Sequence, residues 1–226
     1  MAKTRSTRSA RAGDGDPTSP ALLDATTDAD LVRVPARKAV CIDGEGDPGD
    51  ASFQRCVGAL YGVAYTLKFA RKGTRRPDFK IGALEGRWTA VGQAAPGAIP
   101  PRGAWRWRLR LAMPADVTAR EVAEAIHAAV SRKSGKLEGS REAARVTLER
   151  IAAKRFGRVL HVGPYADEPR SVERIRAMLA EANAEPEHGH LEIYLSDPGR
   201  TAPARLRTVL LLPVARAGER RSRRAS

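Results

Sequence analysis

The short segment 190–196 has three side chains that could do chemistry, His190, Glu192 and Tyr194, at alternate positions. Its polar members are His190, Glu192, Tyr194 and Ser196, and its apolar members are Leu191, Ile193 and Leu195. Because successive side chains of a β-strand point to opposite faces, this alternation predicts a strand with one packed face and one polar face. A carboxylate beside a phenol and an imidazole can act as a general base or attract a cation. The polar row either is exposed to solvent in the ordinary way or lines a pocket.

The elements that must position this strand come in two similar halves. The first half is predicted to contain a strand at 39–42, a polar turn at 43–50, a helix from about residue 52, and strands at 79–88 and 105–111. The second half is predicted to contain helices at 118–130 and 141–154, a strand at 158–162, a Gly-Pro-Tyr turn at 163–165, a helix at 168–182, and strands at 190–196 and 207–214. Each half thus offers a strand, a glycine-containing turn, a helix and two further strands. This repeated order of elements predicts a duplicated α+β unit with a concave surface between the halves.

The composition is that of a globular protein with one large domain or two small ones, since 42% of the 226 residues are hydrophobic. No apolar run reaches the roughly 20 residues of a membrane-spanning helix, and the first residues lack the apolar stretch of a secretory signal.

Cys41 falls in a predicted strand and Cys56 on a predicted helix, which favours buried thiols over a disulfide. His188 and His190 lack a third ligand at suitable spacing, so no metal and no cofactor is expected. We therefore expect a cytoplasmic protein without a bound metal.

The net charge of +14 raises the question of a nucleic-acid partner. Much of the excess lies outside the predicted core, and the last residues, from Arg216 on, hold five arginines against one glutamate. No zinc-finger spacing and no RNA-recognition sheet motif is present. We expect weak association of the basic tails with polyanions and no specific nucleic-acid recognition. The expected division is a disordered polar segment at 1–30, one domain at 31–215 and a basic tail at 216–226.

Five segments arrive in the order found in a known family. They are Ile42–Pro48, Leu84–Trp88, Trp105–Pro114, Leu160–Pro169 and Glu192–Pro198. On these segments, the chain from about residue 33 to residue 215 resembles the GyrI-like small-molecule-binding proteins. It is most similar to the stand-alone branch, and less to the regulators that fuse this domain to a DNA-binding helix-turn-helix. The resemblance implies a duplicated SHS2-type α+β fold, with antiparallel sheets and helices, and a ligand cleft between the two halves.

The resemblance also implies an activity and a set of pocket residues. Some stand-alone members hydrolyse cyclopropane-bearing, DNA-alkylating natural products of the yatakemycin and CC-1065 type and so protect the cell. The family members in regulators instead bind lipophilic cations and other drugs. The family's pocket carboxylate corresponds to Glu192, followed two residues later by Tyr194, and these two are the implied catalytic residues. The implied aromatic ligand-binding residues are Trp88, Trp107 and Tyr165.

The residue types themselves are compatible with this chemistry. Opening a strained cyclopropane conjugated to a dienone needs water at the ring carbon and a donor to the oxygen that gains charge. Glu192 is expected to orient and deprotonate the water, Tyr194 or Tyr165 to donate to the oxygen, and tryptophans to stack on the flat substrate. The sequence departs from the family at two positions. Leu191 stands where many relatives have a second histidine and Thr89 where many have a second tryptophan, and both changes bear on the shape of the pocket.

Other interpretations of these residues stay open at this point. The cleft could belong to a non-catalytic binder or sensor of hydrophobic or cationic drugs, and the family's name adds an inhibitor of a DNA-processing enzyme, which no residue here favours. His161 is expected to be a hydrogen-bonded core histidine, and Tyr61 and Tyr65 are expected to pack between a helix and the sheet. Trp105 and Trp107 share a strand face, and we favour Trp107 for the pocket. The ligand and the oligomeric state are left open.

Overall fold

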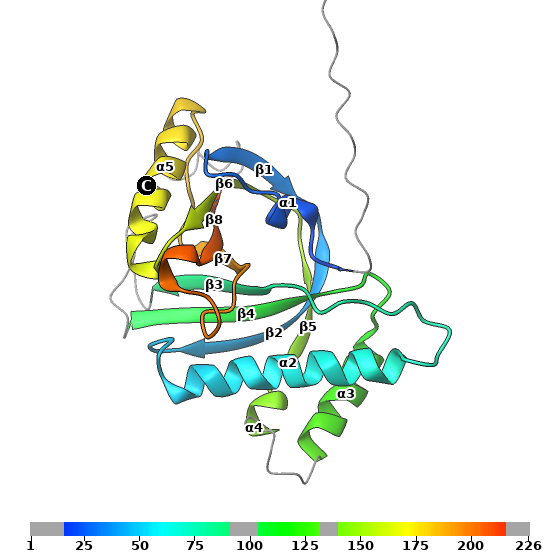
Figure 1. Ribbon diagram of the computed structural model, residues 1–226. Helices are drawn as coiled ribbons and strands as arrows, with labels where there is room; N and C mark the ends of the chain where they lie inside the picture. Colours follow the sequence, from blue (N-terminus) through cyan, green and yellow to red (C-terminus); the bar gives the residue numbers. More distant parts are fainter. Residues whose placement is uncertain (1–15, 91–103, 132–139, 216–226) are drawn as a thin grey trace, which may run out of the picture.

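The computed structural model describes residues 16–90, 104–131 and 140–215, and its dominant element is one curled antiparallel sheet (Figure 1). Its strands are β1 (Asp30–Val34), β2 (Arg37–Glu45), β3 (Leu84–Ala90), β4 (Trp105–Met113), β5 (Thr147–Ile151), β6 (Lys154–Val162), β7 (His190–Tyr194) and β8 (Arg207–Pro213). Their order across the sheet is β1-β6-β8-β7-β3-β4-β2-β5. The helices are α1 (Pro20–Leu23), α2 (Ala51–Arg71), α3 (Ala119–Ser131), α4 (Ser140–Ala143) and α5 (Glu168–Glu181), with short 3-10 turns η2 (Tyr165–Asp167) and η3 (Pro203–Arg205).

The two halves of the sheet have the same strand connectivity. β2 pairs with β4 and β4 with β3; in the same way, β6 pairs with β8 and β8 with β7. β3 and β7 then pair with each other at the centre, with Gly86 opposite Glu192. The predicted duplicated α+β class is confirmed, and the antiparallel strands of the two halves form one continuous sheet. If the two halves formed separate sheets, β3 and β7 would each expose an unpaired edge, and their pairing removes both edges.

One long helix covers the same face of each half (Figure 1). In α2, Leu60, Val63 and Leu67 are buried against β2 and β4, and in α5, Ile175 and Leu179 are buried against β6 and β8. Their spacing of three, four or seven residues puts these side chains on one helix face. Both helices lie over the outer strands of their halves, so the central pair β3–β7 lies between them. Within the described ranges, no helix has the length and apolar content needed to cross a bilayer.

The opposite face of the central strands packs into a separate core. Leu191 and Ile193 of β7 lie there with Val209 and Leu211 of β8 and with Leu22 of α1. The predicted alternation along β7 is confirmed, because its polar row lies on the helix-covered face, where it lines a cleft. The apolar row therefore fixes the direction in which the polar row points.

The N-terminal segment differs from the prediction of disorder over residues 1–30. Residues 16–30 include α1 and lead into β1, which pairs with β6. Leu22 is fully buried in the core below β7, and the guanidinium of Arg158 donates to Asp30 and to the carbonyl of Ala21. Leu22 is the one fully buried leucine of this polar segment, and Ala21, Leu23 and Ala25 pack against the same core. Residues 1–15 and the predicted basic tail lie outside the described part of the chain.

The helix predicted at 141–154 is also wrong over most of its length. After the single turn α4, the chain forms β5, which pairs with the edge of β2. Leu148 packs against the core beneath α2, and Glu149 on the other face pairs with Arg108 at 2.9 Å. The pairing of this segment with the edge of β2 decides its conformation.

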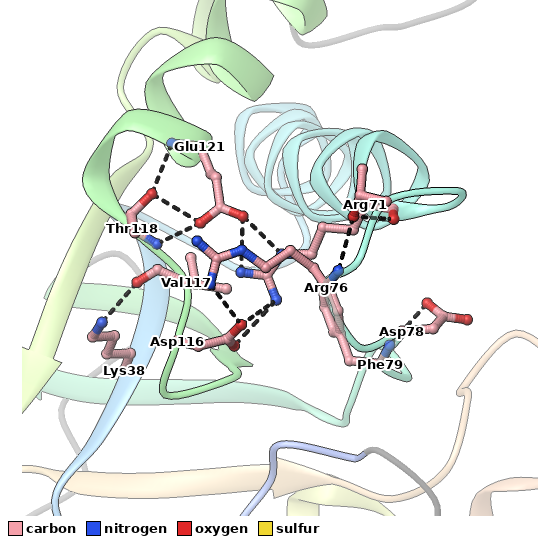
Figure 2. Close-up of polar contacts among 10 residues, drawn as sticks. Lys38, Arg71, Arg76, Asp78, Phe79, Asp116, Val117, Thr118 and Glu121 are labelled. Atoms are coloured by element: carbon pink, nitrogen blue, oxygen red, sulfur yellow. Dashed lines mark hydrogen bonds and ion pairs between the residues drawn. The ribbon is translucent and has the colours of Figure 1, made fainter.

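An ion cluster ties the end of α2 to the start of α3 (Figure 2). The guanidinium of Arg71, which is 3% exposed, donates to both carboxylate oxygens of Asp116 at 3.1 and 3.2 Å and to Glu121 at 3.0 Å. Glu121 also accepts from the backbone and hydroxyl of Thr118, both at 2.8 Å, which is the arrangement of a capping box. The cluster fixes the start of α3 to the end of α2, and none of its residues lines the site described next.

Candidate functional site

A cleft of about 810 Å³ lies over the junction of the two halves. Its floor comes from the paired central strands β3 and β7, and its walls come from α2 on one side and from η2 and the start of α5 on the other. The turn after β7 closes one end. The lining side chains that the following paragraphs use are Phe53, Tyr61, Trp88, Trp105, Tyr165, Glu168, His190, Glu192 and Tyr194. Both halves of the duplicated fold therefore contribute to one cavity.

A hydrogen-bonded chain on the floor holds Glu192, which is 7% exposed. The hydroxyl of Tyr194 donates to Oε2 of Glu192 at 2.6 Å, and Nε2 of His190 lies 2.7 Å from Oε1 and donates to it. The indole Nε1 of Trp88 donates to the Tyr194 hydroxyl at 3.2 Å. Burial, and then the charge of Glu192, raise the pKa of Tyr194 well above its ordinary value, so this phenol keeps its proton and remains a donor. The carboxylate is held in one orientation, with lone pairs left for a further donor.

Gly86 makes room for this chain. It lies opposite Glu192 in the register of β3 and β7. A Cβ at this position would lie 2.8 Å from Nε1 of Trp88 and 3.1 Å from the hydroxyl oxygen of Tyr194. Any larger residue would therefore push the two donors out of place.

Aromatic rings surround the carboxylate. Phe53 stacks on Trp88 with ring centroids 5.9 Å apart, and Trp105 meets the same indole edge-on at 5.4 Å. Trp105 also meets the imidazole of His190 edge-on at 5.6 Å. Such offset and edge-to-face contacts are the favoured geometries of aromatic pairs, so the rings fix one another. The result is an apolar wall suited to a flat hydrophobic ligand.

Glu168, at the first position of α5, is a second buried carboxyl group in the cleft. It is 8% exposed, and its Oε1 is shielded from solvent without a hydrogen-bond partner among the described residues. Burial, and then the charge of Glu192, raise its pKa to about 9. Burial, and then the charges of Glu168, Glu192 and Asp197, raise the pKa of Tyr165 as well. The cleft therefore holds two buried carboxyl groups, and Glu168 is the one whose charged form its surroundings disfavour.

The charge of the cleft differs from that of the chain as a whole. Although the net charge is +14, none of the described residues that line the cleft is a lysine or an arginine. An anionic ligand would find no cation here to replace its hydration, so phosphates and nucleic acids are poor candidates. Among the described residues, no group of histidine, cysteine and acidic side chains has the arrangement of a metal site. The cleft suits a neutral or cationic aromatic molecule.

Comparison with known proteins gives matches among solved structures alone, since no protein-family profile and no curated protein matches the chain. An uncharacterized conserved protein from Listeria innocua is 30% identical, with a TM-score of 0.75 over 85% of this chain and 94% of that chain. The chain belongs to the same family as this Listeria protein. A hydrolase from Listeria innocua is 28% identical, with a TM-score of 0.73 over 84% of this chain and 93% of that chain.

A more distant likeness extends to the fold alone. EcmrR in its complex with DNA is 12% identical, with a TM-score of 0.50, and the match covers 84% of this chain and 57% of that chain. This match shows that EcmrR shares the fold of the chain.

Four of the five residues predicted for the site lie together in the cleft: Trp88, Tyr165, Glu192 and Tyr194. Trp107 does not. Its ring lies beneath Phe53, edge-on at 5.0 Å, and borders a separate groove that contains Arg106 and Arg108. Trp105, two residues earlier on the same strand face, takes the place in the cleft that was expected for Trp107. Gly44 opposite Trp107 explains this, because the ring fills the space in which a Cβ would lie.

Three further expectations concern single side chains. His161 is a buried core histidine, as predicted, with Nδ1 at 3.0 Å from the hydroxyl of Ser171 and Nε2 at 3.1 Å from the carbonyl of Pro164. Tyr61 packs against the core between α2 and the sheet, as predicted, but it also reaches the cleft. Tyr65 is not part of that core and is 44% exposed.

Sequence reasoning missed Glu168 altogether. An acidic residue in the first turn of a helix is ordinarily explained by the helix dipole, and a proline follows it here as at many helix starts. The available signal was its position three residues after Tyr165, which was already assigned to the pocket. One helical turn brings both side chains to the same wall.

Proposed function

We propose that this chain is a GyrI-like small-molecule-binding protein that hydrolyses electrophilic aromatic compounds, of which the cyclopropanoid dienones are the model, and so protects the cell. The observation that carries the proposal is Glu192, held by Tyr194 and His190 beneath the indoles of Trp88 and Trp105. A flat substrate on these rings would bring its strained carbon over the carboxylate. Two cysteines that are buried and free support a reducing, cytoplasmic location.

The reaction follows from the donors and acceptors of the cleft. Glu192 orients a water molecule and takes its proton while the water oxygen bonds to the ring carbon. The cyclopropane carbon–carbon bond breaks, and its electrons move into the dienone, whose oxygen becomes that of a phenol. Tyr194 already donates to Glu192, so its role is to position the base. Tyr165 is the phenol that is left to donate to the substrate oxygen.

The similarity to a hydrolase from Listeria innocua, at 28% identity over most of both chains, supports an enzymatic role. The absence of arginine and lysine from the described lining supports a neutral or cationic substrate. The same features favour a second candidate. A non-catalytic binder or sensor of hydrophobic or cationic drugs would use the same aromatic wall and carboxylate without turnover.

Turnover separates the two functions. The protein is incubated with a cyclopropanoid dienone, and the products are analysed by mass spectrometry. A hydrolase adds one water molecule, and Glu192→Gln lowers kcat by about 100-fold or more because the base is lost. Glu173→Gln, on the exposed side of α5, is the matched control and keeps full activity. An unchanged ligand that quenches tryptophan fluorescence in a saturable way would refute the hydrolase and support the binder.

A further inference from the structure

The cleft contains a carboxyl group that the reaction described above does not use. Glu168 faces the cavity from the start of α5, on the wall opposite α2. Its Oε1 is inaccessible to solvent and has no hydrogen-bond partner, and no arginine or lysine lines the described part of the cleft. In an ionised carboxylate this buried oxygen would have no donor, and the described lining supplies no lysine or arginine as a counter-ion. The geometry by itself therefore favours the neutral, protonated form.

The other titratable groups that line the cleft include one, Glu192, whose charge acts in the same direction. They are Tyr61 from α2, Tyr165 from η2, His190, Glu192 and Tyr194 from β7, and Asp197 from the turn after β7. His190, the one side chain here that can carry positive charge, is engaged with Glu192. The negative charge of Glu192 thus opposes ionisation of its neighbour, as expected when two carboxyl groups share one site.

We infer that Glu168 is the proton donor of the cleft and forms an acid–base pair with Glu192. The inference rests on the proposed hydrolytic function and deepens it. As the ring carbon–carbon bond breaks, the substrate oxygen takes the proton of Glu168 while Glu192 takes a proton from the attacking water. A neutral phenol product, an ionised Glu168 and a protonated Glu192 result, and exchange with solvent restores both groups. The substrate class is accordingly one whose reacting system ends in a carbonyl oxygen.

Tyr165 is a weaker candidate for the same step. Its hydroxyl can donate a hydrogen bond, but burial and the neighbouring carboxyl groups raise its pKa above the ordinary value of 10.0. A carboxylic acid with a pKa of about 9 gives up its proton more readily than such a phenol. Tyr165 therefore orients the oxygen, and Glu168 supplies the proton.

The test compares wild type, Glu168→Gln and the control Glu173→Gln by two measurements. Infrared difference spectra between wild type and Glu168→Gln, at neutral pH, should show the C=O stretch of a protonated carboxyl group that the variant lacks. In hydrolysis of a cyclopropanoid dienone, Glu168→Gln should lower kcat by about 100-fold and change KM by less than about threefold, since the amide still donates a hydrogen bond. The wild-type rate should decline above about pH 9, and that decline should vanish in the variant.

Failure of this inference and failure of the proposed function give different results. An active wild-type enzyme whose Glu168 is ionised at neutral pH, or whose folded Glu168→Gln variant keeps the wild-type kcat, would overturn the proton-donor role alone. A wild-type protein without any turnover of the dienone would overturn the hydrolase and the proton-donor role together. Loss of activity in Glu173→Gln would show that the effect is not specific to the cleft and would also count against the assignment.

Discussion

Replacing Glu168 by glutamine should make the stability of the protein less dependent on pH. In the native state, burial and the charge of Glu192 raise the pKa of this carboxyl group from 4.5 to about 9. Below the lower value both native and unfolded chains hold the proton. Between the two values the unfolded chain releases it while the native chain retains it, so rising pH stabilises the unfolded state. Each pKa unit corresponds to about 1.4 kcal/mol, and the native state should lose about 4 kcal/mol between about pH 5 and pH 8 through this group alone.

The measurement is urea unfolding of wild type and Glu168→Gln at both pH values. Glutamine has the shape of the protonated acid and does not titrate, so the variant should be about 4 kcal/mol more stable relative to wild type at the higher pH than at the lower one. Glu173→Gln, which replaces an exposed carboxylate on the same helix, should show no such divergence. A difference between wild type and Glu168→Gln that is equal at both pH values would refute a neutral Glu168, whatever the activity of the protein.

Three further substitutions test other parts of the structure. Tyr194→Phe removes the donor to Glu192 and should lower kcat at least tenfold with little change in aromatic ligand affinity by fluorescence titration; a wild-type kcat would contradict the positioning role. Arg71→Ala removes the ion pairs with Asp116 and Glu121 shown in Figure 2 and should lower the free energy of unfolding in urea by about 2 kcal/mol. The loss stays at this level because water can reach the two carboxylates, and ligand affinity should be unchanged. Gly44→Ala puts a methyl group into the ring of Trp107 and should destabilise by about 3 kcal/mol or more in thermal unfolding; wild-type stability would show that the ring can move.

Much of the fold was predictable because local patterns and the core agree. The alternation in β7 and β4 and the helical spacing in α2 and α5 each bury a continuous apolar face, so the secondary structure follows from sequence. The short segment around Leu22 and the strand β5 did not follow from local pattern. Their conformation depends on partners far along the chain, β6 for one and β2 for the other.

The candidate site, too, was predictable only in part from the sequence. The sequence by itself determined that Glu192 and Tyr194 share a strand face, because the period of a β-strand is a property of the backbone. Only the tertiary structure decided that Trp105 rather than Trp107 lines the cleft, since both share a face of β4 and the space beside Gly44 selects between them. Glu168 is a tertiary feature as well. Its chemistry comes from desolvation and from a second carboxylate 24 residues away in the chain, and no local pattern encodes either.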